Sequence, residues 1–228
     1  ESAQKRVEGN NYDTRKSVLE YDEVMREQRE IIYGQRLDII TETESLRTIT
    51  VNMIERTITR LVETHTQGEK ETWNLKAIHD FATSVLVHPE SISEDDLKGK
   101  TATEIKDDLI NRSRTVYEEK EKQLSGDQML EFQKVVILRV VDQKWTEHIS
   151  NMDELRQGIG LRSYAQNNPL TEYQTEGYNR FQEMIASVDY DVTRIVMKSE
   201  IRQNLKRESV GSNSDIRAVR EGEVGAAD

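Results

Sequence analysis

Two apolar stripes with the spacing of helices flank a short turn between residues 129 and 203. Both stripes repeat at intervals of three and four residues, which keeps one face of a helix against a partner. The first consists of Leu138, Val141, Trp145, His148, Met152 and Leu155, and the second of Tyr178, Phe181, Ile185, Val188, Val192 and Ile195. Because each stripe needs a surface that covers it, the pattern predicts an antiparallel helical hairpin.

The turn between the stripes reads GIGLRSYAQNNP and contains residues that end one helix and begin another. We expect Gly158 and Gly160 to stop the first helix, because glycine favours helix C-termini. Thr171 and Gln174 have the spacing of a capping box, so we expect them to start the second helix.

The tip of this hairpin differs in charge from the rest of the chain. From residue 158 to residue 170 there is no acidic side chain, although the net charge of the whole chain is -11. Arg162 and Tyr164 are the single arginine and the single tyrosine of the segment. The packing of a hairpin needs no large aromatic side chain in its turn, so we expect Tyr164 to be presented to a partner. The alternative is that Tyr164 folds back and packs on the turn.

Composition restricts the fold class and the location of the chain. Charged residues make up 33% of the sequence and hydrophobic residues only 35%, which suits long helices with solvated faces better than one compact core. Two prolines, three phenylalanines and few β-branched runs disfavour a sheet, so we predict an all-α fold. The sequence has no signal-peptide core and no apolar run near the roughly 20 residues that span a bilayer. It has no cysteine, as is compatible with a reducing cytosol, and its acidity disfavours nucleic acid as a partner.

A third long helix precedes the hairpin. We expect it to begin at Asn11 or Asp13 as the N-cap and to run to about residue 40. We interpret residues 1–11 as a connector and the chain as a fragment of a larger protein. The apolar face of this helix consists of Val18, Tyr21, Met25, Ile32 and Ile39, and its charged outer face of Arg15, Lys16, Glu20, Arg26 and Arg29.

Shorter helices are predicted between the long ones. An amphipathic helix at 44–66 ends near Gly68 and carries Leu46, Ile49, Met53, Ile54, Ile58 and Leu61. We expect a further helix over 73–87, broken at Pro89, then a short helical segment at the SISEDDL sequence, and one that starts at a Thr101/Glu104 capping box and runs through Lys122. Ser125 and Gln128 have the spacing to cap the first arm of the hairpin, and the tail after residue 205 lacks periodicity, as is typical of a flexible segment.

The motifs of catalysis and metal binding are not found in this sequence. The phosphate-binding pattern GxxxxGK[ST] is absent, so we predict no nucleotide hydrolysis by this chain alone. The histidines have neither cysteine partners nor HExxH spacing, so we predict no metal site, no catalytic residue and no cofactor in this chain. They are His65, His79, His88 and His148. His148 and Trp145 lie on the apolar stripe, where core packing is the expected role, and carboxylate clusters are expected to be solvated.

Two blocks of sequence carry a specific resemblance. NYDTRKSVLEYDEVMREQREIIYGQR at 11–36 and WTEHISNMDELRQGIGLRSYAQNNPLTEYQTEGYNRF at 145–181 closely resemble the C-terminal half of SecA, the family of bacterial preprotein translocase motor ATPases. The resemblance covers about residues 1–205. It implies a helical scaffold domain with its connector and long helix at 1–43, a helical wing domain at 44–127, and a two-helix finger of the scaffold at 128–205, followed by a tail at 206–228.

The resemblance also implies a function and a set of partners. In that family the tip of the finger lies at the cytoplasmic mouth of the SecYEG-type channel and contacts the unfolded preprotein. Tyr164 stands at the position of the contacting aromatic residue, and we predict that Arg162, Leu161 and Ile159 join it. ATP and magnesium would belong to motor domains of the same polypeptide that precede residue 1. The implied location is cytoplasmic, at the inner face of the plasma membrane, and the parent protein can form a homodimer.

A different class of function is compatible with the same helices. A stand-alone coiled-coil scaffold would join two partners without touching a moving chain. Such a scaffold does not require an exposed tyrosine in an acid-free loop, whereas a substrate probe does. The tip of the hairpin therefore distinguishes the two hypotheses.

Overall fold

The computed structural model describes residues 2–41, 46–162 and 168–199, and no strand occurs in these ranges, so the predicted all-α fold is confirmed. The α-helices are α1 (Ser2–Thr41), α2 (Leu46–His65), α3 (Leu75–Phe81), α4 (Ala102–Gln123), α5 (Gly126–Arg162) and α6 (Pro169–Lys198). Short helical turns lie between α2 and α4: η2 (Lys70–Thr72), η3 (Ala82–Leu86), η4 (Pro89–Ser91) and η5 (Glu94–Asp96).

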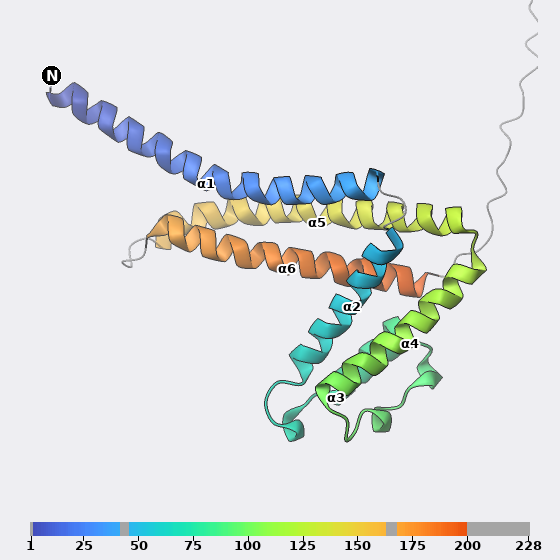
Figure 1. The fold of residues 1–228 in the computed structure, drawn as a ribbon. Coiled ribbons are helices and arrows are strands. Elements are labelled where there is room, and N and C mark those ends of the chain that lie inside the picture. Colours follow the sequence, from blue (N-terminus) through green and yellow to red (C-terminus); the bar gives the residue numbers. More distant parts are fainter. Residues whose placement is uncertain (1, 42–45, 163–167, 200–228) are drawn as a thin grey trace, which may run out of the picture.

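The long helices α1, α5 and α6 lie lengthwise beside one another, and the shorter helices project from one end of this layer (Figure 1). α5 and α6 run antiparallel, as the sequence predicts. α2 descends from the end of α1, crosses α6 and packs against α4, while the N-terminal turns of α1 extend beyond the layer (Figure 1). In the following we call α5 and α6 the finger, and α2 to α4 the wing.

Both ends of the hairpin turn differ from the sequence-based expectation. Gly158 and Gly160 do not stop the first arm, because α5 continues to Arg162. A glycine inside a helix costs only about 1 kcal/mol, which packing of the neighbouring side chains can offset. The prediction that Thr171 and Gln174 form a capping box at the start of the second helix is also wrong. α6 begins at Pro169, whose fixed φ suits the first helical position, and the Asn168 side chain accepts a hydrogen bond from the Leu170 amide at 3.0 Å.

The N-terminal prediction is wrong as well. Residues 2–10 are helical and continuous with α1, so neither Asn11 nor Asp13 is its N-cap. Nothing in residues 2–12 stops a helix, since the segment has no proline and its glycine at position 9 is tolerated. The predicted tail at 206–228 lies outside the described residues.

Two predicted caps are confirmed by hydrogen bonds. Thr101 and Glu104 form a reciprocal capping box: the Thr101 hydroxyl accepts from the Glu104 amide at 3.2 Å, and the Glu104 carboxylate accepts from the Thr101 amide at 2.7 Å. Ser125 and Gln128 make the same exchange at the start of α5, at 3.4 and 3.3 Å. These caps satisfy amides that have no partner in the first turn of a helix.

The helix expected over residues 73–87 is present from residue 75 to residue 86, but its second half is π-helical. α3 begins after Asn74, whose side chain accepts from the Ala77 amide at 3.1 Å, and it continues into one π-helical turn over Ala82–Leu86. Gly68 precedes this region with a φ of 81°, a left-handed conformation that favours glycine and ends α2 close to the predicted point.

The apolar faces form one main core that connects the finger to the wing. The first stripe is confirmed: Leu138 is partly buried and its other five members are buried. The second stripe is correct from Phe181 onward, but Tyr178 is 61% exposed. Gly177 takes the inward position instead, because α6 packs on α1 and α2 as well as on α5 and so buries a wider face. That face contains Tyr173, Gly177, Phe181, Met184, Val188, Val192 and Val196.

Candidate functional site

The base of the finger tip is a small apolar cluster, separate from the main core, where α1 meets both arms. Met152, Leu155 and Ile159 of α5 and Tyr173 of α6 are buried in it, and Tyr21, Val24 and Met25 of α1 cover it. The rings of Tyr21 and Tyr173 meet edge to face with their centroids 4.8 Å apart. Arg156 lies over the Tyr21 ring at 5.6 Å and pairs with Asp22 at 3.1 Å, which fixes the outer edge of the cluster.

The predicted contact residues lie at and beyond this base. Ile159 is only 1% exposed, so its side chain packs inward and supports the tip from below. Leu161 and Arg162 form the last turn of α5, and the structure describes their backbone alone. Tyr164 lies outside the described residues. Contact of these four residues with a preprotein therefore stays a prediction, and the burial of Ile159 does not support it for that side chain.

One polar side chain on α1 reaches both arms of the finger. The Gln28 amide nitrogen donates to the Gly177 carbonyl of α6 at 3.2 Å, and its oxygen lies 2.8 Å from Nε2 of His148 on α5. All three residues are buried, with Gln28 6% and His148 2% exposed. We call this group the Gln28 junction, and it consists of Gln28, His148 and Gly177.

The bonding pattern of the Gln28 junction fixes the proton positions. A backbone carbonyl can only accept, so the amide nitrogen of Gln28 must face Gly177 and its oxygen must face His148. The amide oxygen can only accept in turn, so Nε2 of His148 carries the proton. In the neutral imidazole Nδ1 is then unprotonated.

His148 is held on several sides. Its ring lies between the rings of Trp145 and Phe181, with centroid distances of 5.7 Å to each. Burial of the imidazole, with a further contribution from the Arg180 guanidinium, lowers the pKa of His148 below its ordinary value. The site therefore favours the neutral ring that donates to Gln28.

The glycine of the junction permits the close approach of the helices. A Cβ atom at position 177 would lie 2.7 Å from Cε of Met152 and 3.7 Å from Cγ1 of Val24. Carbon atoms do not approach to 2.7 Å without displacement of one of them. The absence of a side chain at Gly177 thus lets α5, α6 and α1 converge at the level of Gln28.

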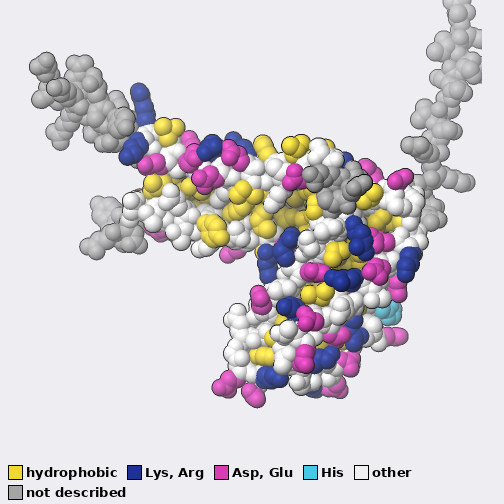
Figure 2. All heavy atoms as spheres, viewed as in Figure 1, with side chains coloured by type: hydrophobic (Ala, Val, Ile, Leu, Met, Phe, Trp, Pro, Cys, Tyr) yellow, Lys and Arg dark blue, Asp and Glu magenta, His cyan; other side chains and the backbone are white. Residues whose placement is uncertain are grey.

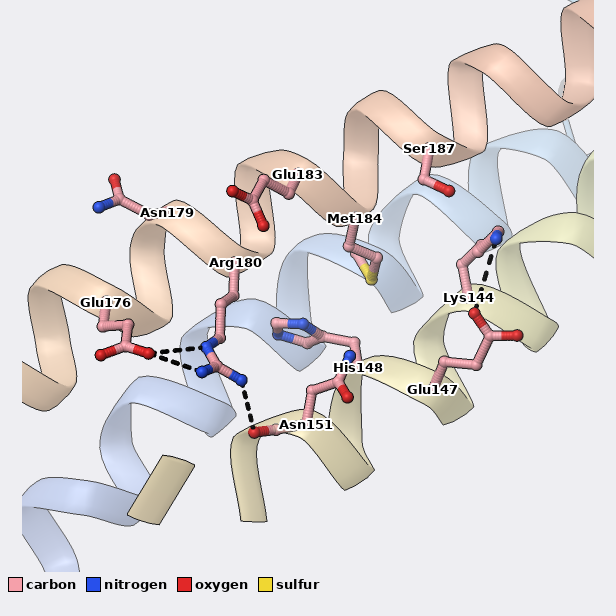
Figure 3. Close-up of a pocket in the computed structure, with 10 residues that line it drawn as sticks. All are labelled: Lys144, Glu147, His148, Asn151, Glu176, Asn179, Arg180, Glu183, Met184 and Ser187. Atoms are coloured by element: carbon pink, nitrogen blue, oxygen red, sulfur yellow. Dashed lines mark hydrogen bonds and ion pairs between the residues drawn. The ribbon is translucent and has the colours of Figure 1, made fainter. Parts of the chain in front are cut away.

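A groove runs along the finger between α5 and α6, next to His148. Its volume is about 590 Å³, and cations and carboxylates line it together (Figure 3). Arg180 pairs with Glu176 at 2.6 Å and donates to the Asn151 carbonyl at 3.2 Å, which ties the two arms across the groove. Lys144 bridges Asp191 of α6 at 3.1 Å in the same way. The mixture of charges favours no single ion as a ligand.

The wing is joined to the finger by a buried carboxylate. Asp189 of α6 is 1% exposed and accepts two hydrogen bonds from Arg56, at 2.6 and 2.9 Å, and one from Arg60 at 2.9 Å. Both arginines lie on α2. Beside them the hydroxyls of Thr57 and Thr193 are 3.1 Å apart. We call Asp189, Arg56 and Arg60 the Asp189 clamp.

The C-terminus of α6 makes a second connection to the wing. The ammonium group of Lys120 on α4 donates to the carbonyls of Val196 and Ser199 at 3.2 Å each, and also to that of Met197. A cation at this end complements the partial negative charge of the unpaired carbonyls. The wing therefore contacts α6 both along its side and at its end.

Sequence analysis placed His148 on the apolar stripe but missed Gln28 and Gly177 of the junction and all three residues of the clamp. For Gln28 a signal existed, because the apolar face of the first helix skips from Met25 to Ile32, and Gln28 stands at the omitted position. A polar residue at a core position marks a specific interhelical contact. Asp189 and Gly177 gave no comparable signal, since acidic residues are frequent in this chain and a glycine within a helical pattern does not show which helix approaches it.

In the part of the chain that the structure describes, no helix combines the length and the apolar character that crossing a bilayer requires. In the same residues no three histidine, aspartate or glutamate side chains gather closely enough to hold a metal ion.

Comparison with known proteins identifies the family of the chain. A family model described as the SecA Wing and Scaffold domain matches residues 1–200, which include every described helix. At this general level the partners of the chain are the Sec translocon and the preprotein. The chain therefore belongs to the SecA wing and scaffold domain family and has its role in SecA protein translocation.

Proposed function

We propose that this chain is the non-catalytic module that couples movement of an ATP-driven motor to the passage of a preprotein through a SecYEG-type channel. The finger acts at the cytoplasmic mouth of the channel, at the inner face of the plasma membrane. Its tip contacts the unfolded chain through Tyr164, assisted by Arg162 and Leu161, while Ile159 packs inward and supports the tip. ATP and magnesium act in motor domains of the same polypeptide.

The observation that carries this proposal is the support of the finger tip by α1. Around the small cluster at Tyr173, side chains of α1, α5 and α6 pack together at the base of the acid-free tip, and the cluster includes Ile159 of the tip segment itself. A displacement of α1 is thereby transmitted to the tip, since close-packed side chains yield little to compression. A tyrosine at the tip suits varied preprotein sequences, because its ring offers apolar contact and its hydroxyl tolerates water.

The outer face of α1 supports contact with motor domains. The predicted charged face is present, with Arg15, Lys16, Arg26 and Arg29 exposed and Glu20 partly so. Apolar side chains are exposed among these charges, and α1 shows both kinds on its outer side (Figure 2). Among the α1 residues whose burial is described, the exposed large apolar side chains are Val18, Leu19, Ile31, Tyr33, Leu37 and Ile40. A mixed surface of this kind is typical of interfaces between domains of one chain.

A site-specific crosslink tests the proposal. A photoreactive amino acid at position 164, in a complete motor that carries this module, should crosslink to a preprotein stalled in the channel. The same group at Tyr178, exposed on α6 but away from the tip, is the matched control and should crosslink weakly. A crosslink of equal strength at both positions, or none at 164, would favour the stand-alone scaffold hypothesis.

A further inference from the structure

We infer that the Gln28 junction sets the register of α1 against both arms of the finger, and that Gln28 is a positioning residue for the transfer of α1 movement to the tip. The inference rests on the proposed function, because it concerns how the finger is driven. It also predicts a structural property that can be measured without transport.

The first observation is that the buried contacts between α1 and the finger are apolar apart from Gln28. The other polar contacts between their described residues, Arg36 with Asp142, Arg156 with Asp22 and Lys134 with the Ile40 carbonyl, lie at the solvent-exposed edge. Among the α1 residues whose burial is described, Gln28 is the single buried polar side chain. Apolar contacts tolerate sliding, because a shifted side chain still meets other apolar atoms. A buried hydrogen-bonding group does not tolerate it, since an unpaired donor or acceptor is strongly unfavourable in an apolar surrounding.

The second observation is that Gln28 uses both ends of its amide, one on each arm. A shift of α1 relative to α5 breaks the bond to His148, and a shift relative to α6 breaks the bond to Gly177. The three helices therefore keep their hydrogen bonds only when they move together. Buried polar groups are best attested in the role of fixing helix register.

The third observation is that both partners of Gln28 are themselves held in place. His148 lies between Trp145 and Phe181, so its ring has little freedom to follow a displaced amide. Gly177 lies against Met152 and Val24, and a Cβ atom at this position would displace the end of the Met152 side chain. The two hydrogen bonds of Gln28 can therefore form together in only one arrangement of the three helices.

The test compares two buried glutamines in the complete motor with its channel. Gln28→Met keeps the length of the side chain and removes both hydrogen bonds. Gln133→Met is the matched control: Gln133 is equally buried on α5, but it donates to the Tyr117 hydroxyl of α4 and has no hydrogen bond to α1. The double variant Gln28→Met/His148→Phe also removes the donor of His148, so a folded protein without the junction is available even if the single variant is unstable.

Two readouts are needed. Because this chain has no cysteine, spin labels can be placed at Cys introduced at exposed Arg29 of α1 and exposed Asn179 of α6, in a motor free of other cysteines. Their distance distribution reports the register of α1. Preprotein transported per ATP hydrolysed reports coupling. The Gln28 variants should keep channel-independent ATP hydrolysis, broaden the distance distribution, and lower transport per ATP by roughly fivefold, as the loss of about two buried hydrogen bonds suggests.

The outcomes separate this inference from the proposed function. An unchanged distance distribution in the Gln28 variants overturns the inference, and so does normal transport despite a broadened one. Equal effects of Gln133→Met also overturn it, because they indicate general loosening of the core. Tyr164→Ala is measured in parallel: if it transports normally while the Gln28 variants lose both register and coupling, the tip contact is wrong and the junction is retained.

Discussion

The guanidinium group of Arg56 on α2 donates two hydrogen bonds, of 2.6 and 2.9 Å, to the carboxylate of Asp189 on α6. Arg60, one turn further along α2, adds a third bond to the same carboxylate at 2.9 Å. Residues separated by more than 120 positions in the sequence are thus joined across the boundary between wing and finger. The angle of the wing to the finger depends on this clamp together with the apolar core around it.

The clamp gives a prediction about stability. Replacing both Arg56 and Arg60 by methionine leaves the buried Asp189 without a cation, which should lower the free energy of unfolding by about 1 to 3 kcal/mol. A fully buried ion pair would lose more stability when its cation is removed. Here the arginine side chains are half-exposed, so solvent screens their interaction with Asp189. Adding Asp189→Asn should restore part of the loss, because no buried charge remains.

Urea unfolding of these variants provides the measurement. Arg114→Met is the control, since Arg114 pairs with Glu55 at the wing surface at 2.6 Å and should contribute less than about 1 kcal/mol. If the Arg56/Arg60 double variant is as stable as Arg114→Met, the clamp does not hold the wing.

Two aromatic residues three positions apart on α6, Tyr178 and Phe181, should differ in how much they stabilise the fold. Phe181 is buried in the core, so Phe181→Ala should destabilise the fold by about 3 to 5 kcal/mol through lost burial and a new cavity. Trp145→Ala should have a similar effect, since Trp145 packs in the same core. Tyr178→Ala should lower the free energy of unfolding by well under half as much as Phe181→Ala, because Tyr178 is exposed. Thermal melts check this, and equal losses at 178 and 181 would contradict the packing of α6.

The pH dependence of stability should carry a contribution from His148. Its pKa is lowered in the folded state by burial, next to Arg180, whereas in the unfolded chain it returns to about 6.5. Between these two pKa values the unfolded state binds more protons, so the free energy of unfolding rises with pH there. The contribution is fully present above about pH 6.5 and is lost as the pH falls toward the folded pKa.

Unfolding free energies of the parent protein and of His148→Phe, measured at neutral and at mildly acidic pH, isolate this contribution. The parent should lose more stability on acidification than the variant, because the variant has no imidazole to protonate. Carboxylates common to both proteins cancel in the comparison. Identical losses would mean that His148 takes up a proton as readily in the folded state as in the unfolded one.

Tyr164 provides the functional prediction. In a complete motor, Tyr164→Ala should leave folding and channel-independent ATP hydrolysis nearly unchanged but impair the movement of preprotein, because only the contact with the moving chain is removed. Tyr164→Phe should retain much of the transport, since apolar contact with varied sequences needs a large ring and no particular hydrogen bond. The amount of protease-protected preprotein in channel-bearing vesicles is the measurement. Normal transport by Tyr164→Ala would make the tip a passive turn.

The sequence by itself determined the elements whose causes are local. The spacing of Val141, Trp145, His148 and Met152 predicted the inward face of α5, because helical periodicity acts along a single helix. The caps at Thr101 and Ser125 were predicted for the same reason, since a capping box involves residues three positions apart. Together with the low apolar content, this periodicity indicated the all-α fold and the antiparallel hairpin.

Only the tertiary structure decided which competing local signals apply. Gly158 and Gly160 read as helix stops, yet α5 continues beyond them to Arg162 while Ile159, between the two glycines, packs against the base of the tip. Tyr178 fitted the stripe of α6, yet Tyr178 is exposed and Gly177 is buried, because α6 packs on α1 as well as on α5 and the side chains of Met152 and Val24 lie against Gly177. The Gln28 junction and the Asp189 clamp were likewise beyond local patterns, since each joins residues more than 110 positions apart whose meeting depends on the packing angles of whole helices.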